Sequence, residues 1–177
     1  MRVGFRHADT RYPFLWEDST QPAARWHDAG TGPAHYISDT SDGAWAEFLR
    51  HEEITDPAEL DGIARSLWTV ELPHNIDKAE RVSMPAATGG LSSYPACQAH
   101  ASARRGTGIT MLAVPSAALV AGGARGQVTD RGLQEAPALD GRNWVLYGPC
   151  PTLRGWRVVE AGAPPTRVLG LVRPLTP

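Results

Sequence analysis

Apolar positions along the chain predict one helix most clearly. Four apolar residues recur at the three- and four-residue spacing of a helix face: Ala44, Trp45, Phe48 and Leu49. Residues 39–42, just before them, read Asp-Thr-Ser-Asp, and such side chains favour helix N-caps. We therefore expect a helix over about residues 43–53. Asp56-Pro57 ends this helix and begins a short helical turn through Leu60.

Weaker patterns predict the rest of the fold. The alanine-rich residues 94–105 favour a second helix, with Ser92 or Ser93 as its N-cap and Gly106 at its end. Short apolar or alternating segments between Gly and Pro predict strands at residues 2–6, 35–38, 65–72, 109–114, 144–147, 157–159 and 167–171. Residues 21–33 are expected to be irregular, and residues 117–142 to form a glycine-rich loop or insert. Two helices among short strands, without regular β-α-β alternation, indicate an α+β fold.

Composition narrows the class of protein. A chain of 177 residues with 42% hydrophobic and 20% charged residues is typical of one globular domain, here residues 1–177. No apolar run reaches the about 18 residues of a membrane helix, and the N-terminus lacks a signal segment, so we expect a cytoplasmic protein with no membrane partner. The net charge of −2 argues against direct binding to nucleic acid.

Common catalytic motifs are missing. The six histidines form no HxxxH or HExxH pair, and Cys97 and Cys150 lack metal-ligand spacing, so no metal is expected. Phosphate-binding GxxxxGK[ST], dinucleotide-binding GxGxxG and nucleophile-elbow GxSxG motifs are also absent.

Of the 17 basic residues only Lys78 is lysine. Genome composition explains most of this bias, although a guanidinium also suits phosphate binding better than an ammonium does.

Four residues are candidates for chemistry, each with an ordinary alternative. Arg25 either projects from its loop to a ligand or lies across Trp26, and Tyr36 is either a sheet-face tyrosine or a ligand-stacking one. Glu47 lies at the edge of the apolar stripe, where a carboxylate is partly desolvated; its alternative is a solvated residue paired with Arg50 or Arg65. Ser116 ends a buried strand, where sites accumulate but where turn serines are also routine.

Six ordered blocks give these candidates a context, because together they resemble the RES-domain family, named for its characteristic Arg, Glu and Ser. The blocks are Ala24-Arg25-Trp26-His27 with Gly30, His35-Tyr36-Ile37-Ser38-Asp39-Thr40, Gly43-Ala44-Trp45-Ala46-Glu47, Tyr94-Pro95-Ala96-Cys97-Gln98, Val114-Pro115-Ser116-Ala117 and Gly141-Arg142-Asn143-Trp144-Val145-Leu146-Tyr147. They span about residues 6–147.

The resemblance implies a fold similar to ADP-ribosyltransferases, with a split mixed or antiparallel sheet and a cleft for NAD. Such proteins are toxins of bacterial toxin–antitoxin pairs that deplete NAD, and a helix-turn-helix antitoxin covers the cleft. Carried over residue by residue, the resemblance makes Glu47, Arg25 and Tyr36 catalytic. It makes Arg25, Tyr36 and Ser116 substrate-binding, with Arg6 as a further candidate contact.

The sequence departs from the family in three places. His27 stands where the family commonly has Asn, the stretch between Ser116 and Gly141 is longer and richer in glycine than expected, and the tail beyond Tyr147 matches no family block. These departures bear on the loop geometry and on the rim of the cleft.

The resemblance leads to an NAD+-degrading enzyme in which Glu47 stabilises the positive charge that develops on the ribose as nicotinamide leaves. Arg25 would bind the pyrophosphate, Tyr36 would stack on or position the nicotinamide or its ribose, and Ser116 would donate a hydrogen bond. The nucleophile is left open among water, phosphate and a protein side chain. Two alternatives remain: a mono-ADP-ribosyltransferase acting on a protein, and an NAD-binding module without turnover.

Overall fold

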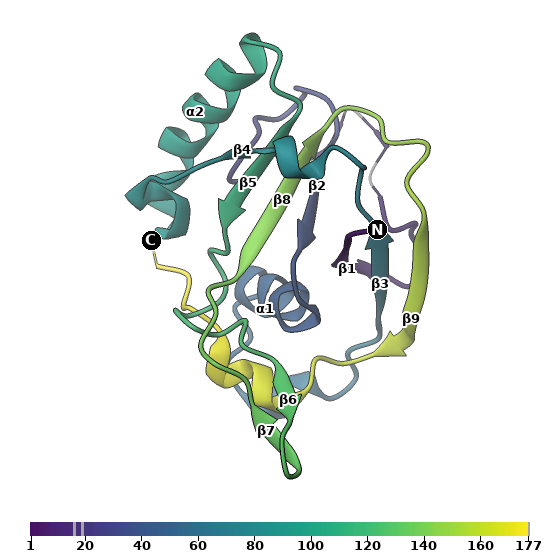
Figure 1. Ribbon diagram of the computed structural model, residues 1–177. Coiled ribbons are helices and arrows are strands. Elements are labelled where there is room, and N and C mark those ends of the chain that lie inside the picture. The colour runs from purple at the N-terminus through teal and green to yellow at the C-terminus, as the bar shows by residue number, and fades with distance from the viewer. Residues whose placement is uncertain (16, 19, 177) are drawn as a thin grey trace.

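The computed structural model describes residues 1–15, 17–18 and 20–176, which form one mixed sheet, two α-helices and a small hairpin (Figure 1). The large sheet has the strand order β4-β5-β8-β2-β1-β3-β9. Its strands are β1 (Val3–Asp9), β2 (Ala34–Ser38), β3 (Arg65–Glu71), β4 (Glu80–Arg81), β5 (Met111–Pro115), β8 (Arg142–Tyr147) and β9 (Gly155–Gly162). The hairpin is β6 (Gln127–Thr129) with β7 (Leu133–Glu135), and the helices are α1 (Ser41–His51) and α2 (Tyr94–Gly106).

The large sheet is split between β1 and β2. These two strands pair at a single position, Phe5 opposite Ser38, whereas β1 pairs with β3 along its whole length from Val3 to Asp9. On the other side β2 pairs with β8 along all of its residues. β4 and β5 are parallel, and the other neighbours are antiparallel. The expected α+β fold with a split mixed sheet is therefore confirmed.

Gly4 permits a close approach between the backbones of the two halves. A Cβ at this position would lie 2.5 Å from Ile37 Cγ2 and 2.9 Å from the Ser38 carbonyl oxygen, both on β2. Because such distances are shorter than van der Waals contact, any side chain here would push β1 away from β2. Glycine thus keeps the halves joined at Phe5–Ser38 while they diverge beyond it.

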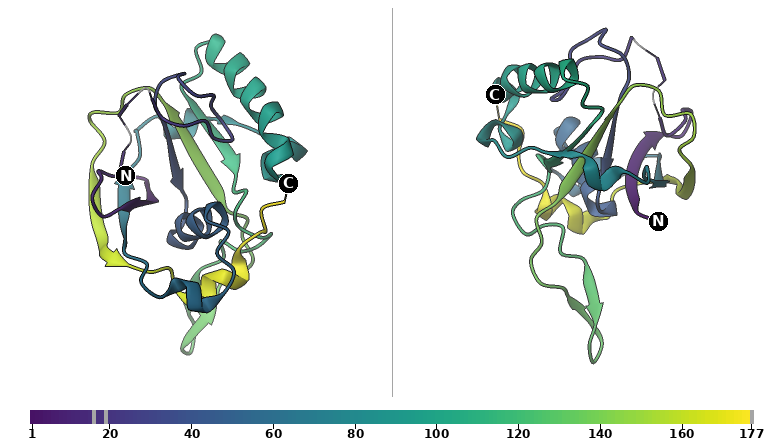
Figure 2. Two further views of the ribbon diagram at one scale, coloured as in Figure 1. Left: turned by 180° about the vertical axis from the view of Figure 1, so that it is seen from behind. Right: turned by 45° about the horizontal axis from the view of Figure 1, so that its top comes forward.

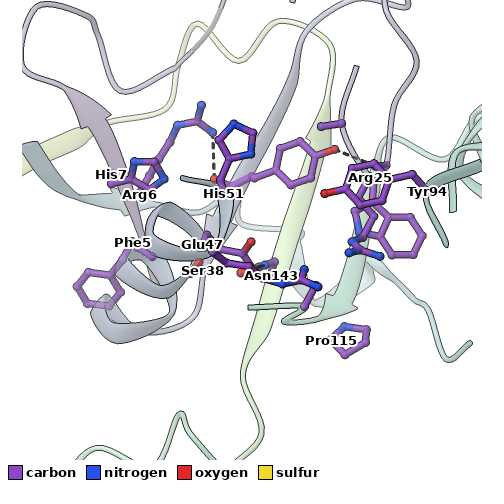
Figure 3. Close-up of a pocket in the computed structure, with 16 residues that line it drawn as sticks. Phe5, Arg6, His7, Arg25, Ser38, Glu47, His51, Tyr94, Pro115 and Asn143 are labelled. Carbon is purple, nitrogen blue, oxygen red and sulfur yellow. Dashed lines mark hydrogen bonds between the residues drawn. The ribbon is translucent and has the colours of Figure 1, made fainter. Parts of the chain in front are cut away.

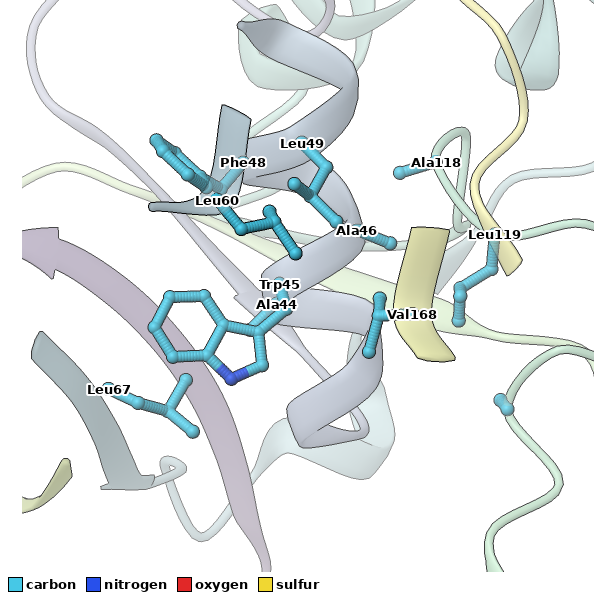
Figure 4. Packing of buried hydrophobic residues seen from close by; sticks show 11 residues of the cluster. Ala44, Trp45, Ala46, Phe48, Leu49, Leu60, Leu67, Ala118, Leu119 and Val168 are labelled. Carbon is cyan, nitrogen blue, oxygen red and sulfur yellow. The ribbon is translucent and has the colours of Figure 1, made fainter. Parts of the chain in front are cut away.

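Helix α1 packs into this split and forms the centre of one hydrophobic core (Figure 4). Its buried residues lie around most of its circumference and contact both β3 and the C-terminal segment, as a helix inside a protein does. The cluster contains Ala44, Trp45, Ala46, Phe48, Leu49, Leu60, Leu67, Ala118, Leu119, Ala124 and Val168. Thr40 caps the helix, its side-chain oxygen accepting a hydrogen bond from Gly43 N at 3.0 Å.

Both predicted α-helices are present, with small differences at their ends. α1 begins two residues earlier than the pattern indicates, and the predicted helical turn is the 3-10 helix η1 (Pro57–Leu60). α2 spans the predicted residues, but the side chain of Ser93 makes no capping hydrogen bond. It interacts instead with Arg25 and with the Gly90 carbonyl oxygen. A run of short elements before α2 was not predicted: η2 (Ile76–Lys78), β4, η3 (Pro85–Thr88) and η4 (Leu91–Ser93).

One prediction about the C-terminal half is wrong, and another acquires a structural detail. Residues 167–171 are not a strand but lie in the 3-10 helix η5 (Thr166–Leu171), because the turn that follows Pro165 buries Val168 against α1. The expected loop at residues 117–142 contains the β6–β7 hairpin, which extends away from the body of the protein (Figure 2). All residues of both hairpin strands are exposed, so no hydrophobic alternation marks them in the sequence.

The C-terminal segment runs from one half of the sheet to the other. β9 extends the half that contains β1 and β3, and η5 packs against α1 (Figure 1). Thr176 lies beside η4, where Leu91 N donates to Thr176 O at 2.9 Å. Within the described ranges, no helix combines the length and the apolar character needed to cross a membrane.

Two deeply placed histidines make the stability of this fold depend on pH. His35 is fully buried; its Nε2 donates to the Gly148 carbonyl oxygen at 3.1 Å, and its Nδ1 has no partner among the described residues. Burial lowers the pKa of His35 to about 4, and burial with the charges of Arg65, Arg6 and His51 lowers the pKa of His7 to about 3.

Because both pKa values are depressed below the unfolded value of 6.5, the unfolded chain takes up protons first. We expect the free energy of unfolding to fall as the pH drops below about 6.5, by up to about 1.4 kcal/mol per pH unit for each histidine. Urea unfolding between pH 7 and pH 4.5 measures this slope. His35→Gln should reduce it, and His74→Gln at an exposed position should not; equal slopes in the two variants would contradict the assignment.

Candidate functional site

A pocket of about 240 Å³ lies where the sheet splits (Figure 3). Its walls come from elements that are far apart in the sequence: β1, the loop before β2, β2, α1, the start of α2, and the ends of β5 and β8. The lining residues are Phe5, Arg6, His7, Ala24, Arg25, Trp26, Tyr36, Ser38, Ala44, Glu47, Arg50, His51, Tyr94, Pro115, Ala117 and Asn143.

The structure brings all five predicted site residues together. Arg6, Arg25, Tyr36 and Glu47 line the pocket. Ser116 lies directly behind Glu47, with its hydroxyl 3.2 Å from Glu47 Oε1. In Figure 3, Glu47 lies between Arg6 on one side and Arg25 on the other.

Two buried donors hold the Glu47 carboxylate. Oε1 accepts hydrogen bonds from the Ser116 hydroxyl and from Asn143 Nδ2, the latter at 2.5 Å, and both donor residues are about 5% exposed. The Ser116 oxygen in turn accepts from the backbone N–H groups of Ala118 and Leu119, so its proton is directed to Glu47. The carboxylate is thus fixed in orientation through one oxygen, and no hydrogen bond from the described residues occupies Oε2.

The alternative interpretation of Glu47 as a flank residue paired with an arginine does not hold for the described residues. Arg50 donates to the Gly89 carbonyl oxygen at 2.9 Å, and the Arg65 guanidinium lies over the Phe48 ring at 4.6 Å. Neither forms an ion pair with Glu47.

Asn143 is a site residue that sequence reasoning missed. It sits on β8 opposite both Ser38 of β2 and Val114 of β5, a register that places it beside Glu47. A polar amide next to the apolar run Trp144-Val145-Leu146 was the available signal, because a buried amide on a strand needs a polar partner.

Tyr36 uses its hydroxyl to organise the loop before β2. The hydroxyl accepts from Trp26 N at 3.0 Å and lies 2.9 Å from His27 Nδ1. His27 Nε2 donates to the Pro22 carbonyl oxygen at 2.8 Å, so Nδ1 is unprotonated and accepts the Tyr36 proton. Burial raises the pKa of Tyr36 and lowers the pKa of His27, which keeps both groups neutral. The histidine at the family's Asn position therefore has a defined partner.

Arg25 is buried and does not lie across Trp26. Its guanidinium stacks over the Tyr94 ring at 4.5 Å and donates to two carbonyl oxygens and one hydroxyl. These acceptors are Ala86 O at 3.0 Å, Ser93 Oγ at 2.7 Å and Gly89 O at 2.7 Å. These three bonds and a further contact with the Cys97 thiol use most of the five N–H donors of the guanidinium.

Arg6 supplies a second cation across the pocket. Its Nη1 donates to the Tyr36 carbonyl oxygen at 3.0 Å, and its buried Nε has no partner in the described chain. Burial lowers the pKa of Arg6 to about 10, so the group is still charged at neutral pH. No carboxylate of the described residues forms an ion pair with it.

The arrangement suits a ligand that carries both signs of charge. A fixed carboxylate favours positive charge next to Glu47, while guanidinium groups on both sides favour anionic groups. Within the ranges described, no group of three or more His, Cys, Asp or Glu residues gathers as a metal site.

The hydrogen-bond chain through Tyr36 can be tested by stability. Tyr36→Phe leaves Trp26 N–H and His27 Nδ1 buried without partners, and each such loss costs about 1–3 kcal/mol. We expect Tyr36→Phe and His27→Phe each to lower the free energy of unfolding in urea, and the double variant to lose less than the two losses combined. Additive losses would contradict the coupling. Tyr12→Phe, at a residue that is 59% exposed, is the control.

Comparison with known proteins gives the family. A search of curated proteins finds no match. Among solved structures, the fold is similar to that in the crystal structure of the M. tuberculosis MbcT–MbcA toxin–antitoxin complex, with a TM-score of 0.53 and 14% identity over 90% of this chain and 85% of that chain. At this identity the likeness concerns the fold alone. The model of the RES domain matches residues 1–152, most of the chain and all six blocks, and on that match the chain belongs to the RES-domain family.

Proposed function

We propose that this protein degrades NAD+ by cleaving the bond between nicotinamide and ribose, with water or phosphate as the nucleophile. The observation that carries the proposal is the Glu47 carboxylate, held by Ser116 and Asn143 in a pocket whose arginines form no ion pair among the described residues. Membership of the RES-domain family supports it, because the resemblance implies NAD as the substrate.

Cleavage of the nicotinamide–ribose bond requires few protein groups besides an oriented carboxylate. As nicotinamide leaves, positive charge develops on the ribose in an oxocarbenium-like transition state. A carboxylate already oriented toward that ring stabilises a charge that is small in the ground state, so it lowers the barrier. Oε2 of Glu47 is the oxygen we assign to this task. Nicotinamide departs as a neutral base, so no general acid is needed to protonate it.

The remaining residues divide between substrate binding and positioning. Arg25 binds the pyrophosphate through its guanidinium, and Arg6, whose Nε has no partner among the described residues, is a further contact to the substrate. Tyr36 contributes its ring to the pocket, because its hydroxyl is already used by His27 and Trp26. Ser116 acts as a positioning residue through its hydrogen bond to Glu47.

For the biological role, we propose a toxin of a toxin–antitoxin pair that acts on cytoplasmic NAD+. The fold resemblance to the toxin–antitoxin complex supports this role. The partner we propose is a helix-turn-helix antitoxin that covers the pocket, and direct contact of this chain with nucleic acid is not part of the proposal.

Glu47→Gln tests the proposal while preserving size and shape. Removing one group that stabilises charge in the transition state lowers rates by roughly 10²–10³-fold, and we expect kcat for nicotinamide release from NAD+ to fall at least that much. Nicotinamide is quantified by chromatography, with and without inorganic phosphate. Glu52→Gln, at the exposed C-cap of the same helix, should keep wild-type activity.

Two results would count against this proposal. The first is that folded wild-type protein releases no nicotinamide under either condition, which would favour a binding module without turnover. The second is that label from NAD+ accumulates on a protein acceptor with no free ADP-ribose, which would favour mono-ADP-ribosyl transfer.

A further inference from the structure

Two guanidinium groups meet at one carbonyl oxygen beside the pocket. Arg25 Nη2 donates to Gly89 O at 2.7 Å, and Arg50 Nη2 donates to the same oxygen at 2.9 Å. Arg25 comes from the loop before β2, and Arg50 lies on α1, three residues after Glu47. Both line the pocket, and each is only 6% exposed.

Neither of these cations forms an ion pair with a carboxylate of the described residues. The arginines that form ion pairs within the described ranges are Arg2, Arg11, Arg104, Arg125, Arg157 and Arg167. Arg25 and Arg50 are not among them, although buried charges are normally paired. Burial and then the charge of Arg25 lower the pKa of Arg50, while the nearby charges of Glu47 and Tyr94 act in the opposite direction.

Arg50 has most of its hydrogen-bonding capacity unused. Of its five N–H groups, one donates to Gly89 O, and its buried Nε has no partner in the described chain. Glu47 is the nearest acidic residue on the helix, but its Oε1 is held by Ser116 and Asn143. The two arginines therefore offer two positive charges, and Arg50 offers unpaired donors, at one side of the pocket.

We propose that Arg25 and Arg50 together form the subsite for a diphosphate group. A diphosphate within a dinucleotide carries two negative charges, which match the two guanidinium groups, and its oxygens accept the planar, paired hydrogen bonds that arginine supplies. Arg50 is thus a substrate-binding residue that none of the six sequence blocks contains. The extension to NAD+ rests on the proposed function; the anion subsite itself does not.

The competing interpretation is that Arg50 has a structural role only, in which its hydrogen bond anchors the segment around Gly89 to α1. Arg173 provides a matched comparison, because it also holds this segment, donating to Thr88 O at 3.4 Å and to Leu119 O at 3.0 Å, yet it does not line the pocket. Arg173→Gln removes an equal charge and hydrogen bonds that anchor the same segment, but it removes no hydrogen-bond donor from the pocket.

Binding of inorganic pyrophosphate, measured by isothermal titration calorimetry, tests the subsite without any turnover. We expect saturable binding to the wild type and a loss of affinity of about tenfold or more in Arg50→Gln, the size of one charge-assisted contact. Arg50→Lys, which keeps the charge and loses the planar fork, should bind with intermediate affinity. Arg173→Gln should stay close to the wild type, and thermal unfolding checks that each variant is folded.

A second measurement links the subsite to the proposed substrate. In Arg50→Gln, kcat/KM for NAD+ should fall about tenfold or more, whereas kcat/KM for nicotinamide riboside, which has no phosphate, should stay at the wild-type value. If Arg50 only anchored the segment around Gly89, the substitution would lower kcat/KM for NAD+ and for nicotinamide riboside to the same extent.

The inference is overturned if pyrophosphate does not bind the wild type, if folded Arg50→Gln binds it as tightly as the wild type, or if Arg173→Gln loses as much affinity as Arg50→Gln. It is also overturned if Arg50→Gln loses activity equally on both substrates. Failure of the proposed function looks different: pyrophosphate binding still depends on Arg50, but NAD+ is not cleaved.

Discussion

The junction between β1 and β2 determines where this protein has a pocket. The two strands share one backbone pair, Phe5 with Ser38, at a place where glycine at position 4 permits contact closer than any side chain would. Beyond this pair the strands belong to different halves of the sheet, and α1 fills part of the space between them. Residues from both halves of the sheet therefore line the pocket.

The burial of α1 explains why one carboxylate becomes so well defined. Most of the helix is buried, so a polar residue at its pocket side is stabilised by partners within the protein. Glu47 finds them in Ser116 at the end of β5 and Asn143 at the start of β8, two neighbouring strands of one sheet half. The same helix carries Arg50 to the cation side of the pocket, so a single element sets the separation between the carboxylate and a proposed anion contact.

Local patterns predicted the features that depend on local interactions. The spacing of apolar residues at 44–49 located α1, and the alternation of residue types at 65–72 located β3. Asn143 and Arg50 were missed because their importance comes from strand register and from a carbonyl group more than thirty residues away along the chain. Residues 167–171 of η5 were predicted as a strand, because the periodicity of so short an apolar segment does not distinguish a strand from a helical turn. The family resemblance, rather than periodicity, selected Arg25, Tyr36 and Ser116 from their ordinary alternatives.

In the proposed function, NAD+ lies in this pocket with its nicotinamide ribose next to the Glu47 carboxylate, which Ser116 and Asn143 already hold in place. A crystal structure of the Glu47→Gln variant with NAD+ bound tests it most directly. We expect density for the nicotinamide ribose beside residue 47 and for the diphosphate beside Arg25 and Arg50. Density for NAD+ elsewhere on the protein, or with the diphosphate remote from both arginines, would contradict it.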